Sequence, residues 1–384
     1  METRKAFDGG VHDSAPAFGR GEENGASACD VVTILEPSQD AIEAGASQPT
    51  IFPLEARSVR PRDLLGLRNL DALYRLNLPE SLLTSYSALR SGMKACLARG
   101  RRAQPVLVAC AGDRLVGFAH FQPTGPDGRW ICLALGASVG VFNVDPVWEA
   151  LLTQGVRAAG LRGVRRLYAR LPQSVPAGEA FRRQGWAPYA AETIFVVHQD
   201  VAVPGAGAGL RRQEPSDTWA IHQLYNQSVP KRVQEAEAYT SHRWDARSRP
   251  GGTDGATVVG VLIEDGQRLV GYARTCSRAG SHYVELVYHP ERRDILHDLI
   301  SGALAALSDR PLRRVYCAVR GYQAEAATAL EDRDFAPMLE QELLVKYTTA
   351  NVRLPAVESV PFHVEVRDKL PQRVPSFLRG RARD

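Results

Sequence analysis

The 384-residue sequence predicts an α/β protein with two tandem domains, each a mixed, mostly antiparallel sheet with helices on both faces. Two blocks of regular apolar patterning, residues 54–201 and 210–352, have similar lengths and repeat the same motifs in the same order. A segment rich in Gly, Ala and Pro, residues 202–209, lies between them and is typical of a flexible linker. These observations predict one domain for each block.

Short motifs recur between the two blocks at an almost constant spacing. The Leu-Val-Gly motif at 115–117 corresponds to the one at 269–271, at an offset of 154 residues. Farther along, Arg-Arg-Leu-Tyr at 165–168 corresponds to Arg-Arg-Val-Tyr at 313–316, at an offset of 148 residues. The second block is therefore six residues shorter between its strand hairpin and the following helix. An internal repeat of this kind predicts two copies of one fold.

The order of elements within each block predicts the mixed sheet. Short apolar runs bounded by turn residues indicate strands, and apolar residues at helical spacing indicate helices. The expected elements of the two blocks are, in order, a helix (64–74; 218–225), two hairpin strands (106–111 and 115–121; 258–263 and 269–273), a third strand (130–135; 283–288), a helix (147–159; 295–307), a strand (166–171; 314–319), a short helix before Gly185-Trp186 and Asp334-Phe335, and a last strand (193–197; 342–346).

Composition argues against several classes of protein. Forty-seven Lys and Arg residues against forty-three Asp and Glu give a net charge of +4, too balanced to favour a nucleic-acid partner. The sequence has no apolar leader and no stretch of about 20 apolar residues, so neither secretion nor a membrane span is predicted. The six cysteines are scattered without metal-ligand spacing, which predicts no metal site and a reducing, cytoplasmic location.

Two segments outside the blocks are predicted to be tails. Residues 1–50 are rich in Gly, Ala, Ser, Asp and Glu and are expected to be disordered. Residues 353–384 form a basic tail that contains several prolines, and a solvated tail is the expectation for such a charge run. The patterned blocks, rather than the tails, are therefore expected to carry the function.

The element order, the Leu-Val-Gly strand after the hairpin tip and the closing unit of helix, Gly-aromatic pair and strand resemble the GNAT superfamily of acyl-CoA-dependent N-acyltransferases. The resemblance covers about 290 of the 384 residues and occurs twice, so the layout is similar to that of tandem GNAT proteins. It implies transfer of an acyl group, such as the acetyl group of acetyl-CoA, to the amine of a small-molecule or peptide acceptor. A protein partner is left open as well.

The resemblance implies that a loop after the third strand binds the CoA pyrophosphate through main-chain N–H groups and a helix N-terminus. In the second block this loop opens with His289-Pro290 and contains Arg292-Arg293, as the family pattern does, but no glycine follows. The loop of the first block, at 135–146, has two glycines and no Arg or Lys. The residues assigned to cofactor binding by this resemblance are Val287, Tyr288, His289, Arg292, Arg293 and Ile295.

Glu285 is the candidate general base. It lies within the apolar strand 283–288, where an unpaired carboxylate is costly, and the resemblance assigns a base to this strand. An outward-facing strand position is the alternative explanation for Glu285. The first block has Leu133 or a neighbour at the equivalent position and no carboxylate on the strand.

Tyr322 is the candidate proton donor to the leaving thiolate. The resemblance implies a tyrosine in this role at the start of the last helical unit, but Phe181 and Leu330 stand there in the two blocks. Tyr322 lies upstream of Leu330 and takes over the role in this hypothesis. An exposed tyrosine at a helix start is the alternative explanation.

Two functions follow as hypotheses. The first is an N-acyltransferase, in the first instance an acetyltransferase, whose second block is the catalytic half. The alternative is a catalytically inactive binding or scaffolding protein derived from the GNAT fold, which the missing glycines and tyrosines favour. Acetyl-CoA binding separates the two hypotheses.

Overall fold

The computed structural model describes residues 54–70, 72–83, 85–98, 104–124, 128–138, 144–198, 209–246, 255–307 and 314–348. The predicted tails at 1–50 and 353–384 and nearly all of the predicted linker at 202–209 lie outside these residues, as does most of the loop that follows the third strand of the first block.

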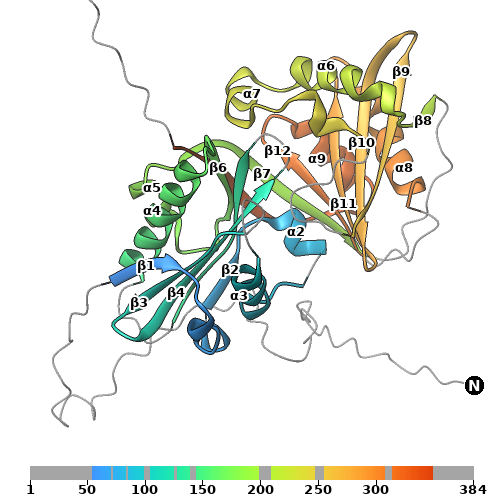
Figure 1. The fold of residues 1–384 in the computed structure, drawn as a ribbon. Coiled ribbons are helices and arrows are strands. Elements are labelled where there is room, and N and C mark those ends of the chain that lie inside the picture. The colour runs from blue at the N-terminus through green and yellow to red at the C-terminus, as the bar shows by residue number, and fades with distance from the viewer. Residues whose placement is uncertain are drawn as a thin grey trace, which may run out of the picture. The chain divides into compact units, whose positions relative to one another are not determined.

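Each half of the chain has helices before and after a run of three consecutive strands (Figure 1). In the N-terminal half they are β1 (Leu54–Ser58), β2 (Ala72–Arg75), α2 (Leu78–Leu83), α3 (Ala88–Leu97), β3 (Val106–Ala111), β4 (Arg114–Thr124), β5 (Arg129–Ala137), α4 (Asp145–Leu161), β6 (Arg166–Pro172), α5 (Gly178–Arg183) and β7 (Ala187–His198). In the C-terminal half they are β8 (Leu210–Arg212), α6 (Thr218–Ser228), α7 (Lys231–Glu237), β9 (Thr257–Asp265), β10 (Arg268–Arg278), β11 (Ser281–Tyr288), α8 (Leu296–Ala305), β12 (Arg314–Arg320), α9 (Ala324–Glu331) and β13 (Ala336–Tyr347). Two short 3-10 helices of the C-terminal half, η5 (Ser241–Trp244) and η6 (Arg293–Ile295), lie close to the site.

The helix expected at 64–74 is absent, and this prediction is wrong. Residues 61–64 and 66–69 form two short 3-10 helices instead, and residues 72–75 form β2, which pairs antiparallel with β5. Gly66 interrupts the segment, and a Cβ at this position would lie 3.0 Å from Cβ of Leu115. Tertiary pairing with β5 therefore overrides the helical spacing of the apolar residues.

The described strands form one thirteen-stranded sheet in the order β1-β3-β4-β5-β6-β13-β7-β12-β11-β10-β9-β8, with β2 attached to β5. Only the β5–β6 and β11–β12 pairs are parallel, and the other pairs are antiparallel. The mixed, mostly antiparallel sheet predicted from the sequence is confirmed.

Both faces of the sheet are covered in each half. On β3, Leu107 packs into the core shared with α4, whereas its neighbour Val108 packs into the core shared with α3. On β9, Val261 faces α8 and α9, and Leu262 faces α6. This alternation follows from the two-residue period of a strand, and it confirms helices on both faces.

The repeated glycine of the Leu-Val-Gly motif has the same packing role in both halves. A Cβ added at Gly117 would lie 2.3 Å from Cγ1 of Val147 at the start of α4. A Cβ added at Gly271 would lie 2.7 Å from Cδ1 of Ile295, just before α8. The motif therefore recurs because a helix crosses the strand too closely for any side chain.

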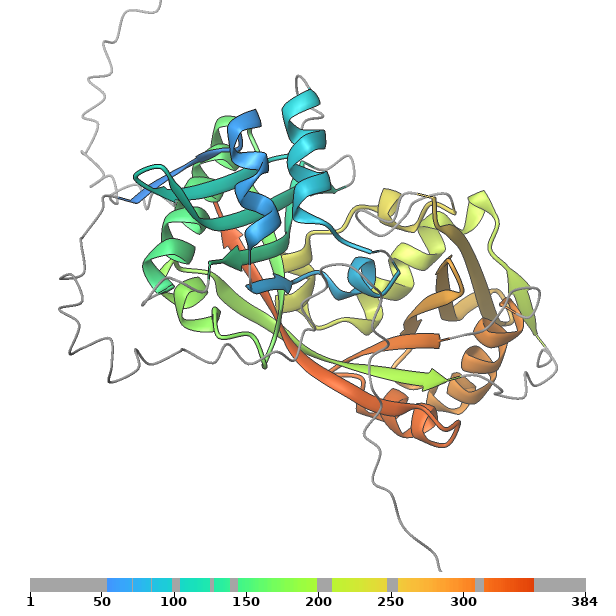
Figure 2. The same ribbon diagram turned by 90° about the horizontal axis from the view of Figure 1, so that it is seen from below.

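The last strands of the two halves are exchanged. β13, from the end of the C-terminal half, pairs with β6, and β7, from the end of the N-terminal half, pairs with β12. The two exchanged strands also pair with each other. Figure 2 shows them as the long green and red strands that run side by side between the two halves. The domain limits expected at 54–201 and 210–352 remain a prediction, because each half is completed by a strand of the other.

A buried carboxylate lies where the exchanged strands meet. Glu192 on β7 is 2% exposed and accepts hydrogen bonds from Nη1 of Arg170 on β6, at 2.8 Å, and from Nε2 of Gln341 on β13. Its other carboxylate oxygen lies 2.8 Å from Nε of Arg320 on β12. One side chain thus connects four neighbouring strands, two from each half of the chain.

Substituting Glu192→Ala is expected to lower the free energy of unfolding by about 3–5 kcal/mol, because it leaves two buried guanidinium groups short of a counter-charge. Glu340→Ala is the matched control. Glu340 is exposed, and its carboxylate accepts one hydrogen bond, from Gln173 at 2.8 Å, so about 0.5 kcal/mol or less is expected. Urea unfolding of both variants measures the difference, and equal losses would contradict this role of Glu192.

Substituting Gly117→Ala is expected to cost about 1–3 kcal/mol of stability, because Val147 is β-branched and has little freedom to move away. Gly160→Ala in α4 is the control, since no atom lies within 4 Å of the added Cβ. This second change is expected to be neutral or stabilising by up to about 1 kcal/mol, because alanine favours the helix. Thermal melts compare the two variants. An unchanged melting temperature for Gly117→Ala would contradict the packing explanation of the motif.

Candidate active site

The two parallel strand pairs separate along their length, but only one of the openings is free. In the N-terminal half, the β5–β6 ladder ends at the pair of Ile131 and Tyr168. Beyond this pair Leu76, fully buried, lies between the two main chains. Its N–H donates to the carbonyl of Leu133 at 2.8 Å, and its carbonyl accepts from the N–H of Arg170 at 3.1 Å. The chain itself therefore closes the N-terminal opening.

In the C-terminal half, the β11–β12 ladder ends at the pair of Glu285 and Ala318. Past this pair the carbonyl of Leu286 accepts a hydrogen bond from Nε2 of Gln323 at 3.1 Å rather than from a strand. A cavity of about 40 Å³ lies at this opening. A space of this size holds a few water molecules or one small polar group.

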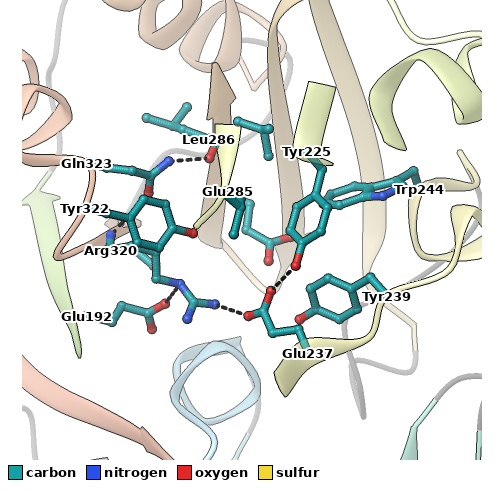
Figure 3. A pocket seen from close by; sticks show the side chains of 13 residues that line it. Glu192, Tyr225, Glu237, Tyr239, Trp244, Glu285, Leu286, Arg320, Tyr322 and Gln323 are labelled. Atoms are coloured by element: carbon teal, nitrogen blue, oxygen red, sulfur yellow. Dashed lines mark hydrogen bonds and ion pairs between the residues drawn. The ribbon is translucent and has the colours of Figure 1, made fainter. Parts of the chain in front are cut away.

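Carboxylates and aromatic rings line the cavity (Figure 3). The lining residues come from β7, β11, β12 and the turn after β12, and from α6, α7, η5 and the segments next to these helices. The lining residues are Glu192, Tyr225, Val229, Glu237, Tyr239, Trp244, Glu285, Leu286, Val287, Ala318, Arg320, Tyr322 and Gln323. Three carboxylates thus face the cavity with a single guanidinium among the lining residues.

Glu285 is held in a close ion pair. Nη2 of Arg243 lies 2.7 and 2.8 Å from the two carboxylate oxygens, and Arg274 stands directly opposite Glu285 on β10. Burial by itself would raise the pKa of Glu285, but the charge of Arg243, with smaller contributions from Arg274 and others, outweighs it and lowers this pKa to about 2. Glu285 is therefore ionised at neutral pH and a weak proton acceptor for as long as Arg243 is bound.

Glu237 forms the second charged group at the cavity. It is 3% exposed, accepts from Nη2 of Arg320 at 3.0 Å and from the Tyr225 hydroxyl at 2.7 Å, and ends α7. Figure 3 shows both contacts as dashed lines converging on its carboxylate. Burial raises the pKa of Tyr225 and of Tyr322, so both phenols keep their protons at neutral pH. The cavity therefore presents fixed carboxylates beside neutral phenols.

The predicted phosphate-binding residues do not all lie together. Val287 lines the cavity, whereas Tyr288 and Ile295 are buried in the core beneath α8. His289 lies near Arg268, with Nε2 at 3.0 Å from Nη2 of that residue. The structure thus gives Tyr288 and Ile295 a packing role.

Both arginines of the loop already have acidic partners. Arg292 pairs with Asp265 and, at 2.9 Å, with Asp294, while Arg293 lies 2.9 Å from Glu325. Neither arginine is buried: their side chains are 31% and 65% exposed. Exposed ion pairs are weak because water screens them, so these arginines can exchange a carboxylate for a phosphate at small cost.

The structure brings the two predicted catalytic residues to one cavity, since Glu285 and Tyr322 both line it. Sequence reasoning missed Arg243, Glu237 and Tyr239. An acidic residue in an apolar strand signals that a cationic partner must exist. The identity of that partner was not readable, because Arg243 lies in an ordinary polar segment 42 residues before Glu285.

No protein-family model matches the sequence, and neither does any curated protein. Among solved structures, the chain is similar to a GCN5-related N-acetyltransferase from Sphaerobacter thermophilus, with a TM-score of 0.51 and 13% identity over 78% of this chain and 98% of that one. It is also similar to a tandem GNAT protein from the clavulanic acid biosynthesis pathway, with a TM-score of 0.48 and 15% identity over 78% and 99% of the two chains.

The likeness to the Sphaerobacter protein concerns the fold. Its coverage exceeds either half of this chain, so the match extends over parts of both. Together with the repeated element order, it confirms the predicted fold: the chain carries the GNAT fold twice in tandem.

Two absences hold for the residues that the structure describes. No group of three or more His, Cys, Asp or Glu side chains in this part of the chain is arranged to hold a metal ion. None of its helices combines the length and the apolar character that crossing a bilayer requires.

Stability should depend on the ionisation of Glu285 at acidic pH. The folded-state pKa lies below the unfolded value of about 4.5, so the ionised group stabilises the protein above that pH and loses this contribution as the pH falls toward about 2. The difference in unfolding free energy between the wild type and Glu285→Gln should be on the order of 3 kcal/mol at neutral pH and shrink through this window. Urea unfolding over a pH series measures it, and a constant difference would contradict the ion-pair assignment.

Proposed function

We propose that this protein is an N-acyltransferase that moves a short acyl group, in the first instance acetyl, from acyl-CoA to an amine, with the C-terminal half as the catalytic half. The observation that carries the proposal is the contrast between the two strand openings. The opening beside Glu285 borders a cavity, whereas the equivalent opening of the N-terminal half is closed by Leu76. We retain the cytoplasm as the proposed location.

The thioester end of acyl-CoA fits the opening between β11 and β12. From Leu286 onward the main chain of β11 is paired with β10 but no longer with β12, and Ala318 leaves space where the N-terminal half has Arg170. Polar main-chain groups aimed at the thioester carbonyl would stabilise the negative charge that develops on its oxygen. The small cavity favours a short acyl group over a long one.

The phosphate end would lie along the loop from His289 to Ile295. Arg292 and Arg293 are the basic groups of this loop, and their exposed ion pairs can open at small cost. No glycine follows them, so the loop has less freedom to wrap a pyrophosphate than the family pattern has. Weak binding of acyl-CoA is the expected consequence.

Glu285 is the proposed base, acting directly or through water. The ammonium of the acceptor gives its proton to the carboxylate, the free amine forms a C–N bond to the acyl carbon, and the C–S bond breaks. As the C–S bond breaks, the nitrogen that attacked loses its second proton to the leaving thiolate, and the proton held by Glu285 is released to solvent. Because the pKa of Tyr322 is raised by burial, its phenol suits hydrogen bonding to the thiolate better than full proton transfer.

A thiol-release assay with acetyl-CoA and a panel of amines tests this function. Glu285→Gln is expected to lower turnover by about 100-fold or more, the typical contribution of a general base. Glu264→Gln is the matched control, because Glu264 lies outside the cavity and pairs with Arg211 at 2.5 Å. Circular dichroism confirms that both variants fold. Equal rates for the wild type and Glu285→Gln would refute the proposed base.

An inactive binding or scaffolding protein is the second candidate. The pairing of Arg292 and Arg293 with carboxylates favours it, because both basic groups of the loop are neutralised. Isothermal titration with acetyl-CoA separates the two functions. Absence of binding at millimolar concentrations would remove the acyltransferase and leave the second candidate.

A further inference from the structure

Arg243 is held as a bound cation would be held. Its guanidinium contacts the Glu285 carboxylate, and its guanidinium carbon lies 5.2 Å from the ring centroid of Tyr239 and 5.5 Å from that of Trp244. A carboxylate together with aromatic faces is the arrangement that proteins use to bind ammonium and guanidinium groups.

All three of these contact residues also face the cavity. Glu285, Tyr239 and Trp244 line it, but Arg243 itself does not. A ligand in the cavity therefore reaches the same carboxylate and the same rings from the other side. Figure 3 shows Tyr239 and Trp244 on the wall opposite Leu286, with the carboxylate of Glu285 between the two walls.

Charge decides what the cavity can accept. The three lining carboxylates share one lining guanidinium, that of Arg320. Glu192 and Glu285 have further arginine partners outside the lining, Arg170 and Arg243. Removing Arg243 without replacement would take from Glu285 its hydrogen-bonded counter-charge and leave Arg274 on β10 as its main remaining cationic neighbour, which is unfavourable for a buried carboxylate. Another cation in the place of Arg243 would avoid that cost.

We propose that Arg243 occupies the cation subsite of the acceptor, and that a protonated primary alkylamine replaces its guanidinium against Glu285, Tyr239 and Trp244. This inference rests on the proposed acyl transfer and names its acceptor class. Neutral arylamines are excluded from the class, because they bring no charge to replace that of Arg243.

The exchange would also place a proton donor beside the base. As long as Arg243 is bound, its charge keeps the pKa of Glu285 low. An ammonium that replaces it can give up a proton, which Arg243 cannot, because a guanidinium stays protonated at any physiological pH. Glu285 therefore becomes a proton acceptor only when the acceptor is in place. The side chain of Arg243 is 14% exposed, so the proposed exchange requires it to move from Glu285 toward solvent.

Chemical rescue of Arg243→Ala tests the subsite without acyl-CoA. The variant is expected to melt below the wild type, and methylguanidinium chloride is expected to raise its melting temperature by about 2–4 °C relative to sodium chloride at equal ionic strength. Arg292→Ala, which removes an exposed arginine with two acidic partners, is the matched control and should show no such gain. The double variant Arg243→Ala/Glu285→Gln should lose the gain as well.

Two outcomes would overturn the proposal. One is a folded Arg243→Ala that melts alike in both salts, and the other is an equal gain in the double variant. If Arg243→Ala does not fold, Arg243→Met, which keeps the aliphatic bulk, replaces it in the comparison of melting temperatures in the two salts. Wild-type crystals soaked with ethylammonium give an answer that depends on no variant: displacement of Arg243 from Glu285 supports the proposal, and an unmoved ion pair in the saturated soak refutes it.

Acetyl-CoA binding, measured separately on the wild type, keeps this inference distinguishable from the proposed function. Rescue of Arg243→Ala without acetyl-CoA binding would support the cation subsite and refute the proposed acyl transfer. Acetyl-CoA binding and turnover without rescue would support the acyltransferase function and refute the place of Arg243 in the acceptor subsite.

Discussion

The buried charge of Glu192 is the interaction on which the arrangement of the two halves depends. Its carboxylate joins Arg170, Arg320 and Gln341, so it connects strands β6, β13, β7 and β12 at the centre of the sheet. Arg320 extends the network to Glu237 at 3.0 Å and hence to the cavity. A charge this deeply buried is tolerated only with its full set of partners, and those partners exist only when both exchanged strands are in place.

The two copies of the fold differ at the position that matters for chemistry. By strand register, Leu133 and Arg170 of the N-terminal half correspond to Glu285 and Ala318 of the C-terminal half. Leu76 binds the main chains of Leu133 and Arg170 and closes the first opening. In the second, a carboxylate and a small side chain leave a polar cavity. One half thus supports the shared sheet, and the other is the proposed site of reaction.

The proposed base depends on a residue from a different part of the chain. A carboxylate with a pKa of about 2 accepts protons poorly, and the closest cause of this low value is Arg243 on η5. The reactivity of Glu285 therefore depends on what occupies the space beside it rather than on its place in β11. This links amine binding and deprotonation to a single exchange of cations.

The sequence by itself determined the internal repeat, the order of elements from the hairpin to the last strand of each block, the mixed sheet and the strand that carries Glu285, because apolar periodicity and turn residues are local signals. The helix predicted at 64–74 was wrong, because residues 72–75 form β2 and pair with the distant strand β5. The tertiary structure alone decided the exchange of β7 and β13, the closure by Leu76 and the pairing of Glu285 with Arg243. These contacts join residues far apart in the chain, and their energies depend on burial and charge that no local pattern records.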